Sequence, residues 1–158
     1  MNQELVFADH NYGELIGNMM QFYIYDFSIY VDRDVDEHGL YTPYPNLSEY
    51  WKGDSDKFAY VIKQDGKCIG FVLVKKLLQE ANTYTIAEFF VMKRYRRKGI
   101  GKNVALQIFE LYKGQWEVFQ MENNLPAQKF WVGVIDEFTN GHFTERFENG
   151  RRIQNFMS

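Results

Sequence analysis

The chain has 158 residues, which is enough for one domain with a buried core. Its net charge of −3 gives no overall field that would attract nucleic acid or an anionic membrane. A single cysteine, Cys68, excludes an internal disulfide, and the three histidines lack metal-ligand spacing, so we infer no metal site. Neither a signal peptide nor an apolar run of about 20 residues that could span a bilayer is recognisable, which predicts a cytoplasmic protein.

The first half of the chain predicts a strand, a helix and a hairpin. Residues 4–8 suit a short strand, and residues 12–30 suit a helix because apolar side chains recur there every three or four positions. The acidic stretch 32–45 predicts a loop whose carboxylates are solvated, after which Asn46 or Ser48 could cap a short helix. Asp65-Gly66 between two β-rich runs is a strong hairpin signal.

The second half predicts alternating strands and helices. The expected order is a strand at 83–92, a helix at 100–112 ending near Gly114, a strand at 116–121, a short helix at 126–132, and a last hairpin turned at Asn149-Gly150. We therefore predict a mixed α/β (α+β) fold, in one domain over residues 1–158.

The stretch from Lys93 to Lys102 carries the chemistry. A strand runs into a basic loop with two glycines, on which a helix opens directly. The start of a helix offers unpaired backbone N–H groups and a positive dipole end, and glycine lets the backbone approach a ligand closely. These features, with the charges of Arg96, Arg97, Lys98 and Lys102, predict a cradle for a diphosphate. A solvated basic loop is the structural alternative.

The spacing Arg96-x-x-Gly99-x-Gly101 resembles the pyrophosphate-binding motif of the GNAT N-acetyltransferase family. A second signature of that family, Asn, then Ala, then usually Tyr, is similar to Asn124, Ala127 and Trp131. The resemblance implies an acyl-coenzyme A N-acyltransferase fold, with a central twisted mixed sheet and flanking helices. It also implies transfer of an acetyl group from acetyl-coenzyme A to an amine, by direct attack in a ternary complex.

The resemblance also implies roles for particular residues. Backbone amides of the loop would bind the diphosphate, backbone groups of the preceding strand would line the pantetheine arm, and a bulge in that strand would free them. Asn124 would hydrogen-bond the arm, with a helix cap before Pro126 as the alternative that could hold at the same time. The cofactor-binding residues implied are Phe89, Phe90, Val91, Arg96, Arg97, Lys98, Gly99, Ile100, Gly101, Lys102, Asn124 and Trp131.

Amine attack on a thioester needs a base, and Glu88 is the best candidate because family members often place a carboxylate on this strand. A carboxyl group among aromatic side chains is expected to have a raised pKa. The alternative is a structural, salt-bridged glutamate. Trp131 stands where many members have Tyr, and an indole does not serve as an acid, so Tyr25, Tyr30, Tyr84, a water or no dedicated acid remain open.

The acceptor site is expected from the first helix, the 32–45 loop and the last hairpin. Tyr23, Asp26 and Tyr30 are candidates, since a carboxylate with aromatic neighbours suits a cationic amine. The acceptor could be a small molecule or a peptide, and exposed aromatics would support a homodimer. Two other functions stay open: a non-catalytic acyl-coenzyme A sensor, and a nucleic-acid-binding patch, which the net charge and the glycines disfavour.

Overall fold

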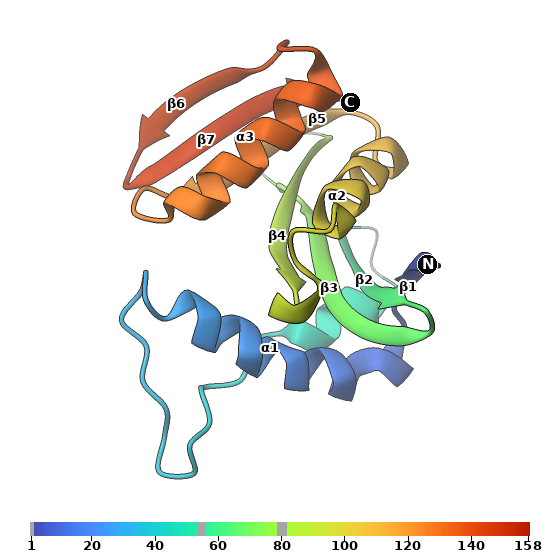
Figure 1. The fold of residues 1–158 in the computed structure, drawn as a ribbon, viewed down its shortest axis with the longest axis vertical. Coiled ribbons are helices and arrows are strands. Elements are labelled where there is room, and N and C mark those ends of the chain that lie inside the picture. Colours follow the sequence, from blue (N-terminus) through green and yellow to red (C-terminus); the bar gives the residue numbers. More distant parts are fainter. Residues whose placement is uncertain (1, 54–55, 79–81) are drawn as a thin grey trace. The chain divides into compact units, whose positions relative to one another are not determined.

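The computed structural model describes residues 2–53, 56–78 and 82–158 (Figure 1). Seven strands form a mixed sheet in the order β1-β2-β3-β4-β5-β7-β6, in which β4 and β5 are parallel. The strands are β1 (Gln3–Phe7), β2 (Lys57–Gln64), β3 (Lys67–Lys76), β4 (Thr83–Val91), β5 (Gln115–Met121), β6 (Thr144–Glu148) and β7 (Arg151–Met157). The helices are α1 (Gly13–Phe27), α2 (Ile100–Leu111) and α3 (Leu125–Thr139), with short 3-10 turns η1 (His10–Tyr12), η2 (Leu47–Trp51) and η3 (Lys93–Tyr95).

By its contacts the chain divides into two compact units. The first comprises Met1–Leu73 with Glu88–Met92, and the second comprises Val74–Ala87 with Lys93–Ser158. We describe each unit by itself.

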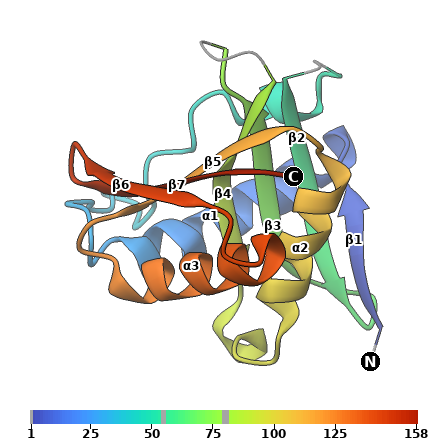
Figure 2. The same ribbon diagram turned by 90° about the horizontal axis from the view of Figure 1, so that it is seen from above.

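The first unit is built on the β1-β2-β3 part of the sheet. β1 pairs antiparallel with β2, and Figure 2 shows β1, β2 and β3 side by side. Asp65 (φ 50°) and Gly66 (φ 75°) both adopt the left-handed conformation, as the tight hairpin turn requires, which confirms the predicted hairpin. α1 buries Ile16, Met19 and Met20, as its spacing predicted.

Gly70 lets β3 come unusually close to β4. A Cβ at Gly70 would lie 2.1 Å from the Phe90 carbonyl oxygen, far inside any real contact. Next to it, the Met92 N–H donates to the Ile69 carbonyl over 2.8 Å. Gly70, where no side chain would fit, therefore allows β3 to hold the backbone at the end of β4 in place.

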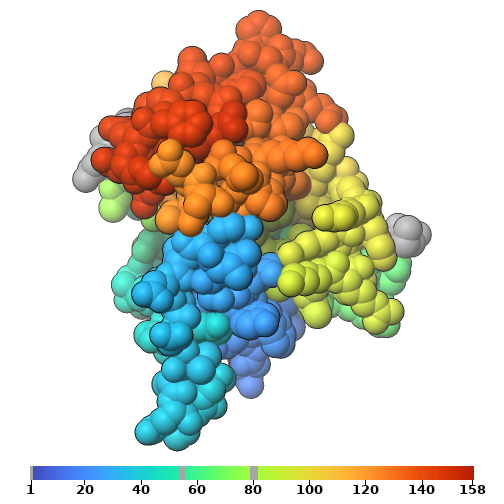
Figure 3. Space-filling view, turned by 60° about the vertical axis from the view of Figure 1, so that its left-hand side comes forward, coloured from blue at the N-terminus to red at the C-terminus, as the bar shows by residue number. Residues whose placement is uncertain are grey.

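The loop between α1 and η2 is long but ordered by side chains (light blue in Figures 1 and 3). The Asp36 carboxylate accepts the N–H groups of His38 (2.8 Å) and Leu40 (3.1 Å) and so closes the loop's tip. Gln21 of α1 donates to the Tyr41 carbonyl (3.0 Å) and accepts its N–H (2.8 Å). Asp36 is exposed, as predicted for the carboxylates of this loop, and it also orders the loop's tip.

The predicted cap of the next turn is confirmed in its position, but not as a side-chain hydrogen bond. Asn46 occupies the N-cap of η2 with φ 57°, but its side chain makes no capping hydrogen bond. A left-handed backbone at that residue sets the entry into the turn instead.

The second unit packs α2 and α3 around an aromatic core. Phe109 of α2 lies 4.9 Å from the rings of both Trp116 and Phe156, and Trp116 is fully buried. α3 lies along β5 and β7 (Figure 1). The final hairpin turns at Asn149 (φ 52°) and Gly150 (φ 73°), as predicted.

α3 is longer than predicted, ending at Thr139 and not near residue 132. Val134 and Ile135 continue the buried stripe beyond Gly133, so packing outweighs the low helix propensity of glycine. The helix stops where Asn140 turns left-handed (φ 51°).

Candidate functional site

The loop between β4 and α2 forms a backbone cradle in the second unit. Arg97 (φ 60°) and the N-cap Gly99 (φ 79°) are both left-handed, which turns the chain sharply before the helix. The helix's first bond runs from the Asn103 N–H to the Gly99 carbonyl (3.0 Å), so the N–H groups of Ile100, Gly101 and Lys102 precede it. A Cβ at Gly99 would meet no atom within 4 Å, so there is open space beside this residue.

The cations around the cradle have different partners. Lys98 and Arg94 each lie 5.8 Å from the centre of the Tyr95 ring, which holds both charges at the loop. Lys102 Nζ lies 2.5 Å from Glu137 Oε2 of α3, so a carboxylate offsets part of its charge. The sequence placed Lys102 among the loop's cations and gave no sign of this ion pair.

Asn124 is the N-cap of α3, and Trp131 lies within that helix. Asn124 is 8% exposed, and its Oδ1 accepts the Ala127 N–H over 3.2 Å, so the predicted helix cap exists. Trp131 is buried, with its ring 6.3 Å from Phe109 and 5.0 Å from Phe130. Within the second unit, β4 and β5 pair through Thr83 with Gln115 and Tyr84 with Trp116, at their N-terminal ends.

In the first unit, Glu88 of β4 meets three tyrosines. Its carboxylate accepts hydrogen bonds from the hydroxyls of Tyr23 in α1 and Tyr44 in the loop, and Tyr44 also hydrogen-bonds with Tyr50 in η2. We call Glu88, Tyr23, Tyr44 and Tyr50 the tyrosine–carboxylate cluster. The sequence suggested Glu88 and Tyr23 but not Tyr44 or Tyr50, which only the folded chain brings to the carboxylate.

The pKa values of all three tyrosines in the cluster are raised. Burial, followed by the charge and hydrogen bond of Glu88, raises the pKa of Tyr23 well above its usual value. Burial and then Glu88 likewise raise the pKa of Tyr44. Burial raises the pKa of Tyr50 to about 12, although its hydrogen bond with Tyr44 acts in the opposite direction. All three hydroxyls therefore stay protonated at neutral pH and can donate.

An aromatic wall stands behind this cluster. The Tyr23 ring lies 5.9 Å from Phe71, 6.0 Å from Phe90 and 5.8 Å from Phe27. Tyr30 continues the row, 6.0 Å from Phe27, and Asp26 is half-buried on the same helix. The first unit thus brings Glu88, Phe90, Tyr23 and Tyr30 into one aromatic region.

Two of the tyrosines considered as acids lie elsewhere. Tyr25 is 68% exposed on the outer side of α1. The Tyr84 ring lies 5.2 Å from Tyr112, the C-cap of α2, and therefore at the opposite end of that helix from Gly99.

Among the described residues, no group of three or more His, Cys, Asp and Glu side chains could hold a metal ion. Within the same residues, none of the helices has the length and apolar character needed to cross a membrane.

Comparison with known proteins assigns the chain to a family. Residues 24–133, well over half of the 158, match the model of the acetyltransferase (GNAT) family. The chain belongs to the GNAT family. Members use acetyl-coenzyme A as co-substrate, and the left-handed, glycine-opened cradle of this GNAT chain fits a diphosphate.

Solved structures confirm the GNAT fold. An acetyltransferase from Thermus thermophilus matches with a TM-score of 0.71 at 12% identity, covering 100% of this chain and 98% of that one. The PaiA N-acetyltransferase from Thermoplasma acidophilum, solved with coenzyme A, matches at 0.69 and 14% identity, with 100% of both chains covered. An Escherichia coli N-acetyltransferase for an alanine of a ribosomal protein matches at 0.65 and 11%, covering 99% and 94%. No curated protein sequence matches the chain.

Proposed function

We propose that this protein transfers an acetyl group from acetyl-coenzyme A to an amine, by direct attack of the amine in a ternary complex. The observation that carries the proposal is the cradle at the start of α2, where two left-handed residues turn the chain and consecutive N–H groups precede the helix's first hydrogen bond. An anion with several oxygens satisfies such groups better than water does, because each bond to a charged oxygen is charge-assisted.

In this proposal the second unit binds the diphosphate of the coenzyme and, through Asn124, part of its arm. Backbone amides from Arg97 to Lys102 hold the diphosphate, and the charges of Arg96, Arg97 and Lys98 surround it. Asn124 presents its remaining amide group to the arm while its Oδ1 caps α3, so both roles proposed for it are compatible. Trp131 supports that helix from its buried side.

The end of β4 contributes backbone groups. Phe89, Phe90 and Val91 would offer peptide N–H and C=O groups to the pantetheine arm and the thioester carbonyl. The close contact of Gly70 with the Phe90 carbonyl supports this role, because it holds the strand in a single position.

Bound acetyl-coenzyme A supplies the acetyl group in activated form, as a thioester. Glu88 accepts the proton that the amine must lose, and the hydroxyls of Tyr23 and Tyr44 hold its carboxylate in place. A dedicated acid is not required, because a thiolate leaves easily. The second proton, which the nitrogen loses after attack, passes to the departing thiolate, so that coenzyme A leaves as the thiol.

The acceptor is a cationic amine, held before deprotonation by the charge of Glu88 and by aromatic faces such as Tyr23 and Tyr30. Asp26 offers a second carboxylate on the same helix.

The test is a thiol-release assay with acetyl-coenzyme A and a panel of small amines, polyamines and peptides. Release that depends on one class of amine, with the acetylated product found by mass spectrometry, is expected. Tight binding of acetyl-coenzyme A without release for any amine would favour the non-catalytic sensor. Absence of both binding and release would overturn the proposal.

A further inference from the structure

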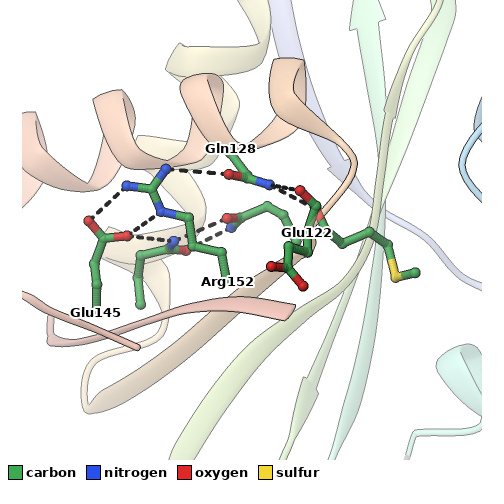
Figure 4. Close-up of polar contacts among 7 residues, drawn as sticks. Glu122, Gln128, Glu145 and Arg152 are labelled. Carbon is green, nitrogen blue, oxygen red and sulfur yellow. Dashed lines mark hydrogen bonds and ion pairs between the residues drawn. The ribbon is translucent and has the colours of Figure 1, made fainter. Parts of the chain in front are cut away.

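A polar network runs beneath α3, from an ion pair near the surface to buried amide groups (Figure 4). It runs from Glu145 on β6 through Arg152 on β7 to Gln128 on α3, and ends at the carbonyl groups of Met121 and Glu122, where β5 turns into α3. All of these residues belong to the second unit. Because buried polar groups are costly unless paired, such a chain needs a reason to be there.

Gln128 is the centre of the network. It is 6% exposed, and its Nε2 donates to the Met121 carbonyl (3.0 Å) and the Glu122 carbonyl (2.9 Å). The same Met121 carbonyl accepts the Asn124 N–H over 3.0 Å. Both hydrogens of the Gln128 amide therefore bind the four-residue turn from Met121 to Asn124.

Arg152 fixes which way this amide points. Its Nη1 donates to Gln128 Oε1 over 3.4 Å, while its Nε and Nη2 bind both oxygens of Glu145 (2.6 and 3.1 Å). If the Gln128 amide were reversed, its oxygen would face two carbonyl oxygens and its NH₂ group would face the guanidinium. The bidentate pair of Arg152 with Glu145, each side chain 27% exposed, thus selects the orientation that grips the turn.

A second contact holds the turn from the hairpin side. The Glu122 N–H donates to the Gly150 carbonyl over 2.9 Å. Gln154, fully buried on β7, pairs through both amide groups with Gln120 (2.7 and 3.0 Å) and donates to Glu145 (3.3 Å). The turn from Met121 to Asn124 is therefore tied to both β7 and α3.

We propose that Gln128, oriented by Arg152, is a positioning residue for acetyl-coenzyme A: it holds the Met121–Asn124 turn so that the Asn124 amide meets the coenzyme arm. This rests on the proposed function, in which Asn124 contacts that arm. A network that merely stabilised the unit could bind α3 at any point, whereas this one ends on the carbonyls three and two residues before the proposed ligand-binding side chain of Asn124.

The test compares Gln128→Glu with two controls by calorimetric titration of acetyl-coenzyme A and by steady-state kinetics. Gln128→Glu keeps the size of the side chain but replaces the two donors with oxygen, so the turn loses both bonds. Gln107→Glu makes the same change at an exposed site on α2. Ile135→Val shrinks the core under α3 and lowers the thermal midpoint without touching the turn.

We expect Gln128→Glu to raise the Kd and KM for acetyl-coenzyme A about tenfold, the effect of losing two hydrogen bonds, with kcat at saturation nearly unchanged. Arg152→Lys, at the half-exposed end of the network, should raise the Kd and KM less. Lysine keeps the positive charge but lacks the two parallel N–H groups that bind both oxygens of Glu145. This variant also serves as the test should Gln128→Glu fail to fold.

Unchanged Kd in both variants, with binding by the unaltered protein intact, would overturn this inference and leave the proposed function standing. So would an equal rise in Ile135→Val at a matched loss of thermal midpoint, because a purely structural role predicts it. Absence of binding by the unaltered protein would overturn both.

Discussion

At Glu88, one carboxylate accepts hydrogen bonds from two half-buried tyrosines, and the aromatic wall of Tyr23, Phe71 and Phe90 stands beside it. Such a carboxylate is held in a single orientation, which suits a base that must meet an amine in a fixed geometry.

Replacing Glu88 with Gln tests its role as the base. We expect kcat to fall about 10²- to 10⁴-fold, as for loss of a general base, while the Kd for acetyl-coenzyme A stays the same. Glu110→Gln on the exposed side of α2 is the matched control, and its kcat should be unaltered. Near-normal turnover by Glu88→Gln would assign the carboxylate a structural role.

The three tyrosines predict a stability loss at alkaline pH with a definite sign. A tyrosine in the unfolded chain ionises near pH 10, whereas burial raises the pKa of Tyr23 and Tyr44, and that of Tyr50 to about 12. The unfolded state therefore loses protons first, so the stabilisation is complete below about pH 10 and falls as pH rises through the folded-state pKa values.

Urea unfolding at a series of alkaline pH values measures this loss. Tyr50→Phe should flatten the fall, because the group that titrates is gone, and Tyr25→Phe should not, because Tyr25 is exposed. Equal slopes in Tyr50→Phe and the unaltered protein would contradict the account.

At the scale of elements, the approach of β3 to β4 predicts opposite effects of two identical substitutions. Gly70→Ala places a Cβ 2.1 Å from the Phe90 carbonyl oxygen and should destabilise the protein by about 1–3 kcal/mol or more, as overpacking does. Gly17→Ala, in α1 with open space around its Cβ, should stabilise it by about 0.5–1 kcal/mol. Chemical denaturation of both variants provides the measurement, and a neutral Gly70→Ala would contradict the close approach.

The elements that the sequence predicted well are those with local signals. Asp65-Gly66 and Asn149-Gly150 dictate left-handed turns by their own chemistry, so both hairpins were predictable. The end of α3 was not predictable, because the helix continues past Gly133 through the tertiary burial of Val134 and Ile135, which no local signal indicates.

The candidate site likewise has a part that the sequence predicted and a part that it did not. The cradle follows from glycine spacing beside a helix start, which is a local property of the chain. Tyr44 and Tyr50 come close to Glu88 because the loop folds back, held in part by the hydrogen bonds between Gln21 and Tyr41. Contacts between residues so far apart in the sequence produce no periodic pattern from which they could be predicted. The Gln128 network could not be predicted either, since its members come from β5, α3, β6 and β7.

At the scale of the whole molecule, membership of the GNAT family and the sheet order agree with the fold that the motif spacing implied. The single-domain organisation and the homodimer stay predictions. The central claim, that the α2 cradle binds the diphosphate of acetyl-coenzyme A, depends on the space in front of Gly99.

Calorimetric titration of acetyl-coenzyme A into Gly99→Ala and Gly66→Ala tests this claim most directly. Both glycines have positive φ (79° and 75°) and open space around a Cβ, so both substitutions cost about 1–2 kcal/mol of backbone strain. Only Gly99 fronts the cradle, so Gly99→Ala should weaken binding by about tenfold or more while Gly66→Ala binds like the unaltered protein. Equal affinity in all three proteins, or no binding by the unaltered protein, would contradict the account.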